Sequence, residues 1–249
     1  MNMDLKNKNI LITGGAKRVG AAISRYLSAR GAHMIIHFNR SVQEAKNLHA
    51  ELTGLNRPVD FVQADLENLS GLHDMVDTVL QKHGRIDGLI CNASIFFHTP
   101  FFSVTEEEWD QIVAVNLKSY FFLCQMIGKK MVEQKSGKIV IITDVSADHP
   151  WCGYLPYTIT KAGLAHLVKG LAKTLSPSVQ VNGVAPGTVL PPEDASARQV
   201  EKYENQTLLK RVGTPDDIAK TVHFLIADSE FITGVNIPVD GGYRLRGNG

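Results

Sequence analysis

A short apolar segment followed by glycines and then by a helical pattern restricts the fold of this chain more than any other feature. The segment Asn9–Thr13 (NILIT) is typical of a buried strand. Gly14 and Gly15 follow it, and apolar residues at helical spacing then continue until Gly31. Because a helix N-terminus offers free N–H groups and the positive end of its dipole, this strand, turn and helix predict a phosphate-binding site. A plain tight turn is the alternative interpretation.

The rest of the chain alternates between strand and helix patterns. We predict further strands at residues 34–38, 59–63, 87–92, 138–143, 179–184 and 234–239, with one long helix over 106–134. This alternation is typical of the α/β class and predicts a single Rossmann-type, doubly wound parallel sheet with helices on both faces. Residues 1–249 are expected to form one domain, with an irregular substrate loop at about 186–206.

Composition excludes several classes of function. The formal net charge of +1 over 249 residues gives no electrostatic reason to bind nucleic acid or an anionic membrane. No apolar run reaches the length of a membrane span, and the N-terminus is polar. The three cysteines are widely spaced, which favours a cytoplasmic location, and the nine histidines show no ligand spacing, so we predict no metal site. The expected partner is a small-molecule substrate.

Ligands of such sheets bind at the carboxyl ends of the strands, so the residues there are candidates for cofactor binding. Arg40 lies twenty residues after Gly20, and no acidic residue lies between His37 and Ser41. A basic residue at this place suits the extra phosphate of NADPH, whereas an acidic one suits NAD. A solvated loop arginine is the alternative. Asp65, at the end of another predicted strand, is expected either to accept a hydrogen bond from adenine or to cap the following helix.

Tyr157 and Lys161 are the candidates for proton transfer. They are four residues apart on a predicted helix and therefore share a face. A lysine cation beside a phenol is expected to lower its pKa from about 10 and make it a usable proton donor. Asp144, thirteen residues before the tyrosine, is a second possible acid. Asn116 lies among apolar residues, and we expect it to be either a structural polar contact or part of a proton path.

Four phenylalanines, at positions 96, 97, 101 and 102, follow the predicted strand 87–92. Packing beneath a helix or against another subunit is one explanation, and stacking of one ring on a planar substrate is the other. Periodicity alone favours packing.

Several motifs together resemble the short-chain dehydrogenase/reductase family over nearly the whole chain. They are Thr13–Gly20 (TGGAKRVG), Cys91–Ser94 (CNAS), Tyr157–Lys161 (YTITK), Val181–Gly187 (VNGVAPG) and Val239–Gly242 (VDGG). The resemblance implies an oxidoreductase with a nicotinamide cofactor, and a homotetramer assembled through two long helices.

Three positions differ from most of that family. Arg18 and Ser94 stand where most members have glycine, and Asp144 stands where most have serine. Together they resemble the pteridine reductase branch, which includes dihydromonapterin and dihydrofolate reductases. This resemblance implies an NADPH-dependent transfer of hydride to a pterin, with Phe96 stacked on the pterin ring. That expectation reverses the preference for packing.

The resemblance also assigns roles to individual residues. Asp144 and Tyr157 would supply protons and Lys161 would hold the ribose. The catalytic set is Asn116, Asp144, Tyr157 and Lys161, and the substrate set is Arg18, Ser94, Phe96, Asp144, Tyr157 and Leu190. The cofactor set is Gly14, Lys17, Arg18, Val19, Gly20, Asn39, Arg40, Ser41, Asp65, Leu66, Asn92, Ala93, Ser94, Thr143, Tyr157, Lys161, Pro186 and Gly187.

Two other functions remain open at this point. In a carbonyl reductase, such as a 3-oxoacyl-(acyl-carrier-protein) reductase, Asp144 would replace the usual serine without a change of substrate class, or would simply cap the strand end. The other is a protein that senses NADPH without catalysis. The intact pair of Tyr157 and Lys161 counts against a sensor, because a sensor needs no proton donor.

Overall fold

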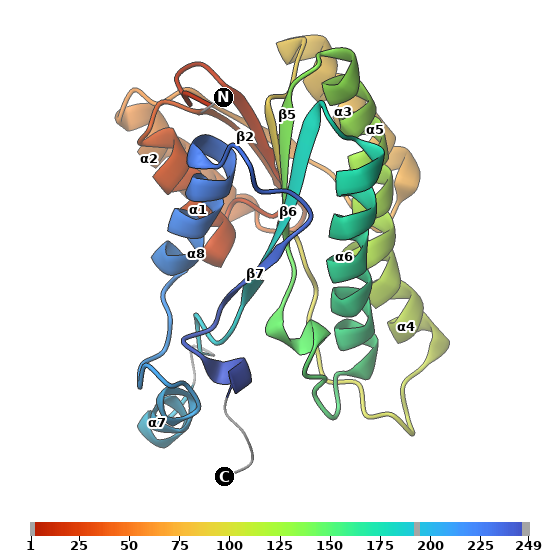
Figure 1. Cartoon of the computed structure of the whole chain (residues 1–249), viewed down its shortest axis with the longest axis vertical. Helices are drawn as coiled ribbons and strands as arrows, with labels where there is room; N and C mark the ends of the chain where they lie inside the picture. The colour runs from red at the N-terminus through yellow and green to blue at the C-terminus, as the bar shows by residue number, and fades with distance from the viewer. Residues whose placement is uncertain (1–2, 192–194, 246–249) are drawn as a thin grey trace.

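The computed structural model describes residues 3–191 and 195–245. A parallel sheet forms the centre of the molecule, in the strand order β3-β2-β1-β4-β5-β6-β7 (Figure 1). This arrangement confirms the predicted α/β class with a doubly wound parallel sheet. The strands are β1 (Asn9–Ile12), β2 (His33–Phe38), β3 (Val59–Gln63), β4 (Gly88–Cys91), β5 (Gly137–Ile142), β6 (Val179–Pro186) and β7 (Asn236–Val239).

Helices cover both faces of the sheet (Figure 1). One face carries α1 (Arg18–Ser28), α2 (Val42–Gly54) and α8 (Pro215–His223), and the other carries α3 (Leu69–His83), α5 (Ser119–Glu133) and α6 (Leu155–Thr174). The strands alternate between the two layers, since Ile10 and Ile12 belong to one apolar cluster and Leu11 to the other. None of the described helices is long and apolar enough to cross a membrane.

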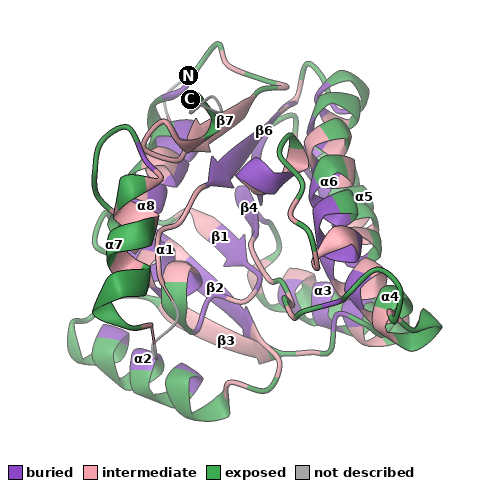
Figure 2. Ribbon diagram, turned by 90° about the horizontal axis from the view of Figure 1, so that it is seen from below, coloured by how far each residue is buried: buried purple, intermediate pink, exposed green. Residues whose placement is uncertain are grey.

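The order of the strands places the ligand crevice. The chain builds β1, β2 and β3 outward in one direction and then returns to add β4 on the other side of β1. Loops that leave β1 and β4 therefore diverge to opposite faces, and this divergence opens a crevice at the carboxyl ends of the two strands. Figure 2 shows β3, β2, β1, β4, β6 and β7 in this order across the molecule, with buried residues concentrated in the sheet and exposed ones on the outer sides of the helices.

The predicted helix over 106–134 is interrupted. It consists of α4 (Glu106–Val113), a π-helical turn at Ala114–Lys118, and α5. Asn116 lies within this turn and is fully buried. Single π-helical turns inside helices occur often at functional sites, because the extra residue re-aims the side chains around it.

The predicted substrate loop at 186–206 is not wholly irregular, because residues 197–205 form helix α7 (Ala197–Asn205). The signal for its start was present in the sequence. Ser196 Oγ accepts a hydrogen bond from Gln199 N, and the side chain of Gln199 accepts one from Ser196 N, which together make a capping box. Residues 192–194 of the predicted loop lie outside the described residues.

Candidate active site

The turn after β1 matches the predicted phosphate-binding turn in its geometry. Gly14 has a φ of +61°, which only glycine adopts without strain. At Gly20 the constraint is contact instead, since a Cβ atom there would lie 2.1 Å from the carbonyl oxygen of Gly14. Arg18, at the start of α1, has a φ of +51°. This left-handed conformation is strained for arginine but not for glycine, which most members of the short-chain dehydrogenase/reductase family have at this position.

Hydrogen bonds attach this turn to the end of β4. Thr13 Oγ1 accepts hydrogen bonds from the backbone N–H groups of Asn92 (2.9 Å) and Ala93 (3.1 Å). The amide nitrogen of Asn92 donates to the carbonyl oxygens of Thr13 and Gly14, each at 3.0 Å. The side chain of Asn92 thus holds the two walls of the crevice at a set distance.

The side chain of His37 attaches the turn to the strands on its other side through hydrogen bonds. Its Nδ1 accepts from Gly14 N at 3.1 Å, so its Nε2 carries the proton and donates to the carbonyl oxygen of Ala64, also at 3.1 Å. Burial lowers the pKa of His37 to about 4, so the ring is neutral at neutral pH. The sequence places His37 inside a strand, and periodicity carries no sign of this bridge between the ends of β1, β2 and β3.

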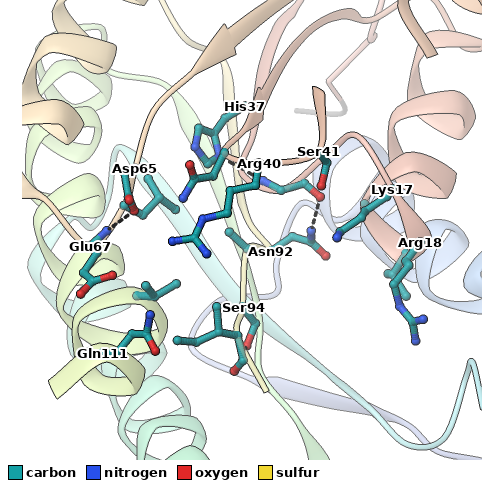
Figure 3. Close-up of a pocket in the computed structure, with 18 residues that line it drawn as sticks. Lys17, Arg18, His37, Arg40, Ser41, Asp65, Glu67, Asn92, Ser94 and Gln111 are labelled. Atoms are coloured by element: carbon teal, nitrogen blue, oxygen red, sulfur yellow. Dashed lines mark hydrogen bonds between the residues drawn. The ribbon is translucent and has the colours of Figure 1, made fainter. Parts of the chain in front are cut away.

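A cavity of about 410 Å³ lies over this turn. Figure 3 shows Arg40 reaching into it, with Lys17 and Arg18 on one side and Asp65 and Glu67 on the other. Much of the predicted cofactor set lines it: Gly14, Lys17, Arg18, Val19, Gly20, Asn39, Arg40, Ser41, Asp65, Leu66, Asn92, Ala93 and Ser94. Sequence reasoning missed His37, Glu67, Ile95, Gln111 and Val115. Thr143, Tyr157, Lys161, Pro186 and Gly187, which were also predicted, are not part of this lining.

The cavity fits a dinucleotide in chemistry as well as in place. Its lining includes the cations Lys17, Arg18 and Arg40, which suit phosphate groups. The glycine turn packs closely against the end of β4, because an added Cβ would lie 2.9 Å from Ala93 at Gly14 and 2.8 Å from Asn92 at Gly20. Asp65, which lines the cavity, accepts a hydrogen bond at Oδ1 from Glu67 N at 3.1 Å, which is a local turn contact.

A second group of polar side chains lies where β5 ends and α6 begins. Tyr157 donates its hydroxyl hydrogen to Asp144 Oδ2 at 3.0 Å, and Asp144 Oδ1 accepts from Ser146 N at 2.8 Å. Lys161 Nζ donates to the carbonyl oxygen of Ile142 at 3.2 Å and lies 5.3 Å from the centre of the Tyr157 ring. The structure therefore brings together three of the four predicted catalytic residues.

The electrostatics of this group differ from the prediction. Burial raises the pKa of Tyr157 well above its ordinary value, and the charge of Asp144 and the hydrogen bond to it raise it further. Burial lowers the pKa of Lys161 to about 8, against the opposing effect of Asp144. The expectation that the pKa of Tyr157 falls below its ordinary value is thus wrong for the free protein. The carboxylate accepts the phenol hydrogen and penalises phenolate, whereas a serine in its place would carry no charge.

Asn116, the fourth predicted catalytic residue, contacts the loop after β4. Its side-chain oxygen accepts from Ile95 N and its amide nitrogen donates to Ile95 O, each at 2.9 Å. Both atoms of the amide therefore have partners within the protein, as the alternative of a structural polar contact requires. This contact orients the loop that carries Ser94 and Phe96 on either side of Ile95.

Phe96 forms part of an aromatic wall beside Tyr157. Its ring stacks on Tyr154, with centroids 4.5 Å apart and planes 9° apart, and meets Tyr157 edge-on at 4.8 Å. Half of the residue, 51%, remains exposed. Phe96 thus packs against protein on one face while another part of its surface stays open. Leu190, of the predicted substrate set, lies near Arg18, whose Nη2 donates to its carbonyl oxygen at 3.5 Å.

Known proteins match this chain along nearly its whole length. Residues 14–244 match the family described as Enoyl-(Acyl carrier protein) reductase. The 3-oxoacyl-(acyl-carrier-protein) reductase FabG of Thermotoga maritima is 34% identical over 96% of this chain and 99% of its own. Dehydrogenase/reductase SDR family member 4 of Homo sapiens is 32% identical over 97% of this chain and 89% of its own. The crystal structure of gox2181 superposes with a TM-score of 0.91 at 29% identity, over 97% of both chains.

The chain belongs to the short-chain dehydrogenase/reductase family. Membership makes it an oxidoreductase that works with a nicotinamide cofactor and a small-molecule substrate, as expected from the sequence. It does not support the pteridine reductase branch, and the expected reduction of a pterin is contradicted by several relatives that are named 3-oxoacyl-(acyl-carrier-protein) reductases. That expectation depended on a few positions around the site, Arg18, Ser94 and Asp144, whereas the relatives match across the whole fold.

The close contact at Gly20 predicts a specific failure when a methyl group is added. Gly20→Ala would place its Cβ 2.1 Å from Gly14 O and 2.8 Å from Asn92 Nδ2, so the turn must shift. We expect at least about tenfold weaker binding of NADPH and a loss of about 2–3 kcal/mol in the free energy of unfolding. Fluorescence titration and urea unfolding measure the two effects.

The matched control is Gly170→Ala, which lies on α6 with no atom within 4 Å of the added Cβ. It should leave NADPH affinity unchanged and stabilise the protein by about 0.5–1 kcal/mol, because alanine favours the helix. Similar NADPH affinity in both variants would contradict the role given to Gly20.

The buried neutral ring of His37 predicts a loss of stability in mild acid. The unfolded chain takes up a proton at His37 below its ordinary pKa of 6.5, whereas the folded protein does so only near 4. The stabilisation is therefore complete above pH 6.5 and is lost as the pH falls towards 4. Between pH 7 and pH 5 we expect the wild type to lose about 2 kcal/mol more free energy of unfolding than His37→Gln. Equal losses in urea unfolding at the two pH values would contradict this assignment.

Proposed function

We propose that this protein is an NADPH-dependent carbonyl reductase that acts on a 3-oxoacyl thioester. The names of several relatives at 29–34% identity support this substrate class. The single observation that carries the proposal is the contact of Tyr157, Asp144 and Lys161 at the carboxyl end of β5, beside the wall formed by Phe96 and Tyr154. A phenol and an ammonium in this arrangement suit the reduction of a ketone to an alcohol.

In this proposal the hydroxyl of Tyr157 donates a proton to the oxygen of the ketone as that oxygen gains negative charge. A nicotinamide cofactor, when bound, would supply the hydride for this reduction. Lys161 is protonated at neutral pH, because burial lowers its pKa only to about 8, and its charge stabilises the tyrosine as it loses the proton. Deprotonation of Lys161 above pH 8 removes this support.

Asp144 sets the working pH in this proposal. In the free protein it accepts the hydrogen of Tyr157 and raises the pKa of the phenol. An incoming carbonyl oxygen must take over that hydrogen bond, and the carboxylate repels the charge that develops on the oxygen. Asp144 is therefore not required as an acid. It stands in place of the usual serine, and it makes ketone reduction slower than a serine would.

The preference for NADPH is part of the same proposal. Arg40 projects into the cavity where the second strand ends, beside Asn39 and Ser41. A guanidinium binds a phosphate group with two parallel hydrogen bonds, and the described lining has no carboxylate on this segment to hold the ribose hydroxyls of NAD.

We also propose that the protein is cytoplasmic and forms a homotetramer. Support for assembly comes from Phe121 on α5 and Ile159 on α6, two large apolar side chains that are exposed on neighbouring helices. The location is supported by the cysteines, because Cys91, Cys124 and Cys152 are free thiols that form no disulfide bond.

The proton chemistry predicts opposite effects for two substitutions. Tyr157→Phe should lower kcat/KM about 100- to 10,000-fold, because the proton donor is lost. Asp144→Ser should keep or raise kcat/KM and shift its pH profile to lower pH, because removal of the carboxylate lowers the pKa of both Tyr157 and Lys161. The assay follows NADPH absorbance with acetoacetyl coenzyme A, and crotonyl coenzyme A serves as an enoyl comparison.

Two results would contradict the proposed function. One is the absence of turnover with acetoacetyl coenzyme A alongside turnover of the enoyl thioester. The other is a large loss of activity in Asp144→Ser, which would make the carboxyl group a necessary proton donor.

The cofactor preference predicts that Arg40→Ala raises the KM for NADPH about tenfold or more, while the KM for NADH stays unchanged, because only NADPH carries the extra phosphate. Lys46→Ala removes the same charge from α2, outside the cavity, and should change neither value. An equal effect of Arg40→Ala on the KM values of both cofactors, measured by initial rates, would show that Arg40 does not bind the extra phosphate.

A further inference from the structure

Three side chains meet at the amino ends of β2 and β3, whereas the active-site cavity lies at the carboxyl ends of the strands. His33 is the first residue of β2, Asp60 lies near the start of β3, and His83 is the last residue of α3. They are separated by more than twenty residues in the sequence, so only the fold brings them together. None of them contributes to the cavity or to the catalytic group described above.

The donor atoms of these three residues converge. His33 Nε2 lies 2.9 Å from Asp60 Oδ2, and His83 Nε2 lies 3.5 Å from the same oxygen. All three donor atoms lie within 4.8 Å of one another. The rings of the two histidines stand nearly perpendicular, at 85°, with centroids 5.0 Å apart, so they approach the carboxylate from different directions.

This spacing is close to that of ligands around one metal ion. A tetrahedral zinc ion with bonds of about 2.0–2.2 Å holds its ligand atoms roughly 3.3–3.6 Å apart. The separations of 2.9 and 3.5 Å lie around this range and the two imidazole nitrogens are at most 4.8 Å apart, so an ion can enter once the hydrogen bond between His33 and Asp60 opens. Two imidazoles and one carboxylate also form a common zinc ligand set, with a further position open to water.

The surroundings of the three residues allow an ion to enter. His83 is 7% exposed, whereas His33 and Asp60 are each 26% exposed, which leaves a path from solvent. Lys82 Nζ contacts Asp60 Oδ1, but its side chain is 60% exposed and free to turn away.

We propose that His33, Asp60 and His83 form a binding site for a divalent transition-metal ion, with zinc as the expected occupant. The ion joins the edge strand β3, its neighbour β2 and the end of α3, and its role is to stabilise this edge of the sheet. The spacing argument from the sequence predicts no metal site because it considers only histidines close in the chain. This site is assembled from three separate elements.

Zinc titration of the full-length protein tests the proposal, with a chromophoric chelator as competitor. We expect one strong equivalent in the wild type and at least about tenfold weaker binding in His83→Gln and in His33→Gln. The matched control is His73→Gln, an exposed histidine on the same helix, which should bind as the wild type does. Zinc should raise the melting temperature of the wild type and not that of His83→Gln.

A fourth variant separates a metal site from an ion pair. Lys82→Ala removes the cation that competes for Asp60, so zinc binding should tighten, by about threefold or more. If a histidine variant fails to fold, this variant and the visible spectrum of the cobalt-loaded wild type still decide the question. Equal zinc affinity in all variants, weaker binding in Lys82→Ala, or no binding by the wild type would each overturn the proposal.

Discussion

The close approach of the β1 turn to the end of β4 is the contact on which the rest of the site depends. At Gly14 an added Cβ would lie 2.9 Å from Ala93, and the amide of Asn92 donates to the backbone on the opposite wall. These two segments are neighbours only because the strand order reverses at β1 and β4. The crevice is therefore a consequence of topology, and its width is set by one asparagine side chain and by the absence of a side chain at Gly14.

The loop after β4 connects this cavity to the catalytic group. Ser94 and Ile95 line the cavity, and the next residue, Phe96, contacts Tyr157. Asn116 holds the middle of this loop through Ile95, from a π-helical turn that interrupts α4 and α5. A buried amide with two backbone partners fixes the loop more firmly than apolar packing alone, because either bond that is lost leaves a buried polar group without a partner.

The pair of Asp144 and Tyr157 shows how one substitution changes the balance of an otherwise standard site. Lys161 is close enough to favour phenolate, yet burial and the neighbouring carboxylate dominate, and the pKa of Tyr157 rises. Burial acts on Lys161 in the same way and lowers its pKa to about 8. Desolvation is therefore the largest influence on both groups, and the carboxylate raises the pKa of each.

Local pattern in the sequence determined the elements and the order in which they follow one another. The strand, the glycine turn and the helix that follows can be read from residues 9–31, and the shared face of Tyr157 and Lys161 follows from helical spacing. These features depend on neighbours within a few residues. Only the tertiary structure decided three other interactions. They are the hydrogen bonds that join Gly14 and Ala64 through His37, the hydrogen bond by which Asp144 disfavours ionisation of Tyr157, and the cluster of His33, Asp60 and His83. Those interactions join residues far apart in the chain, and both their distances and their desolvation exist only once the sheet has assembled.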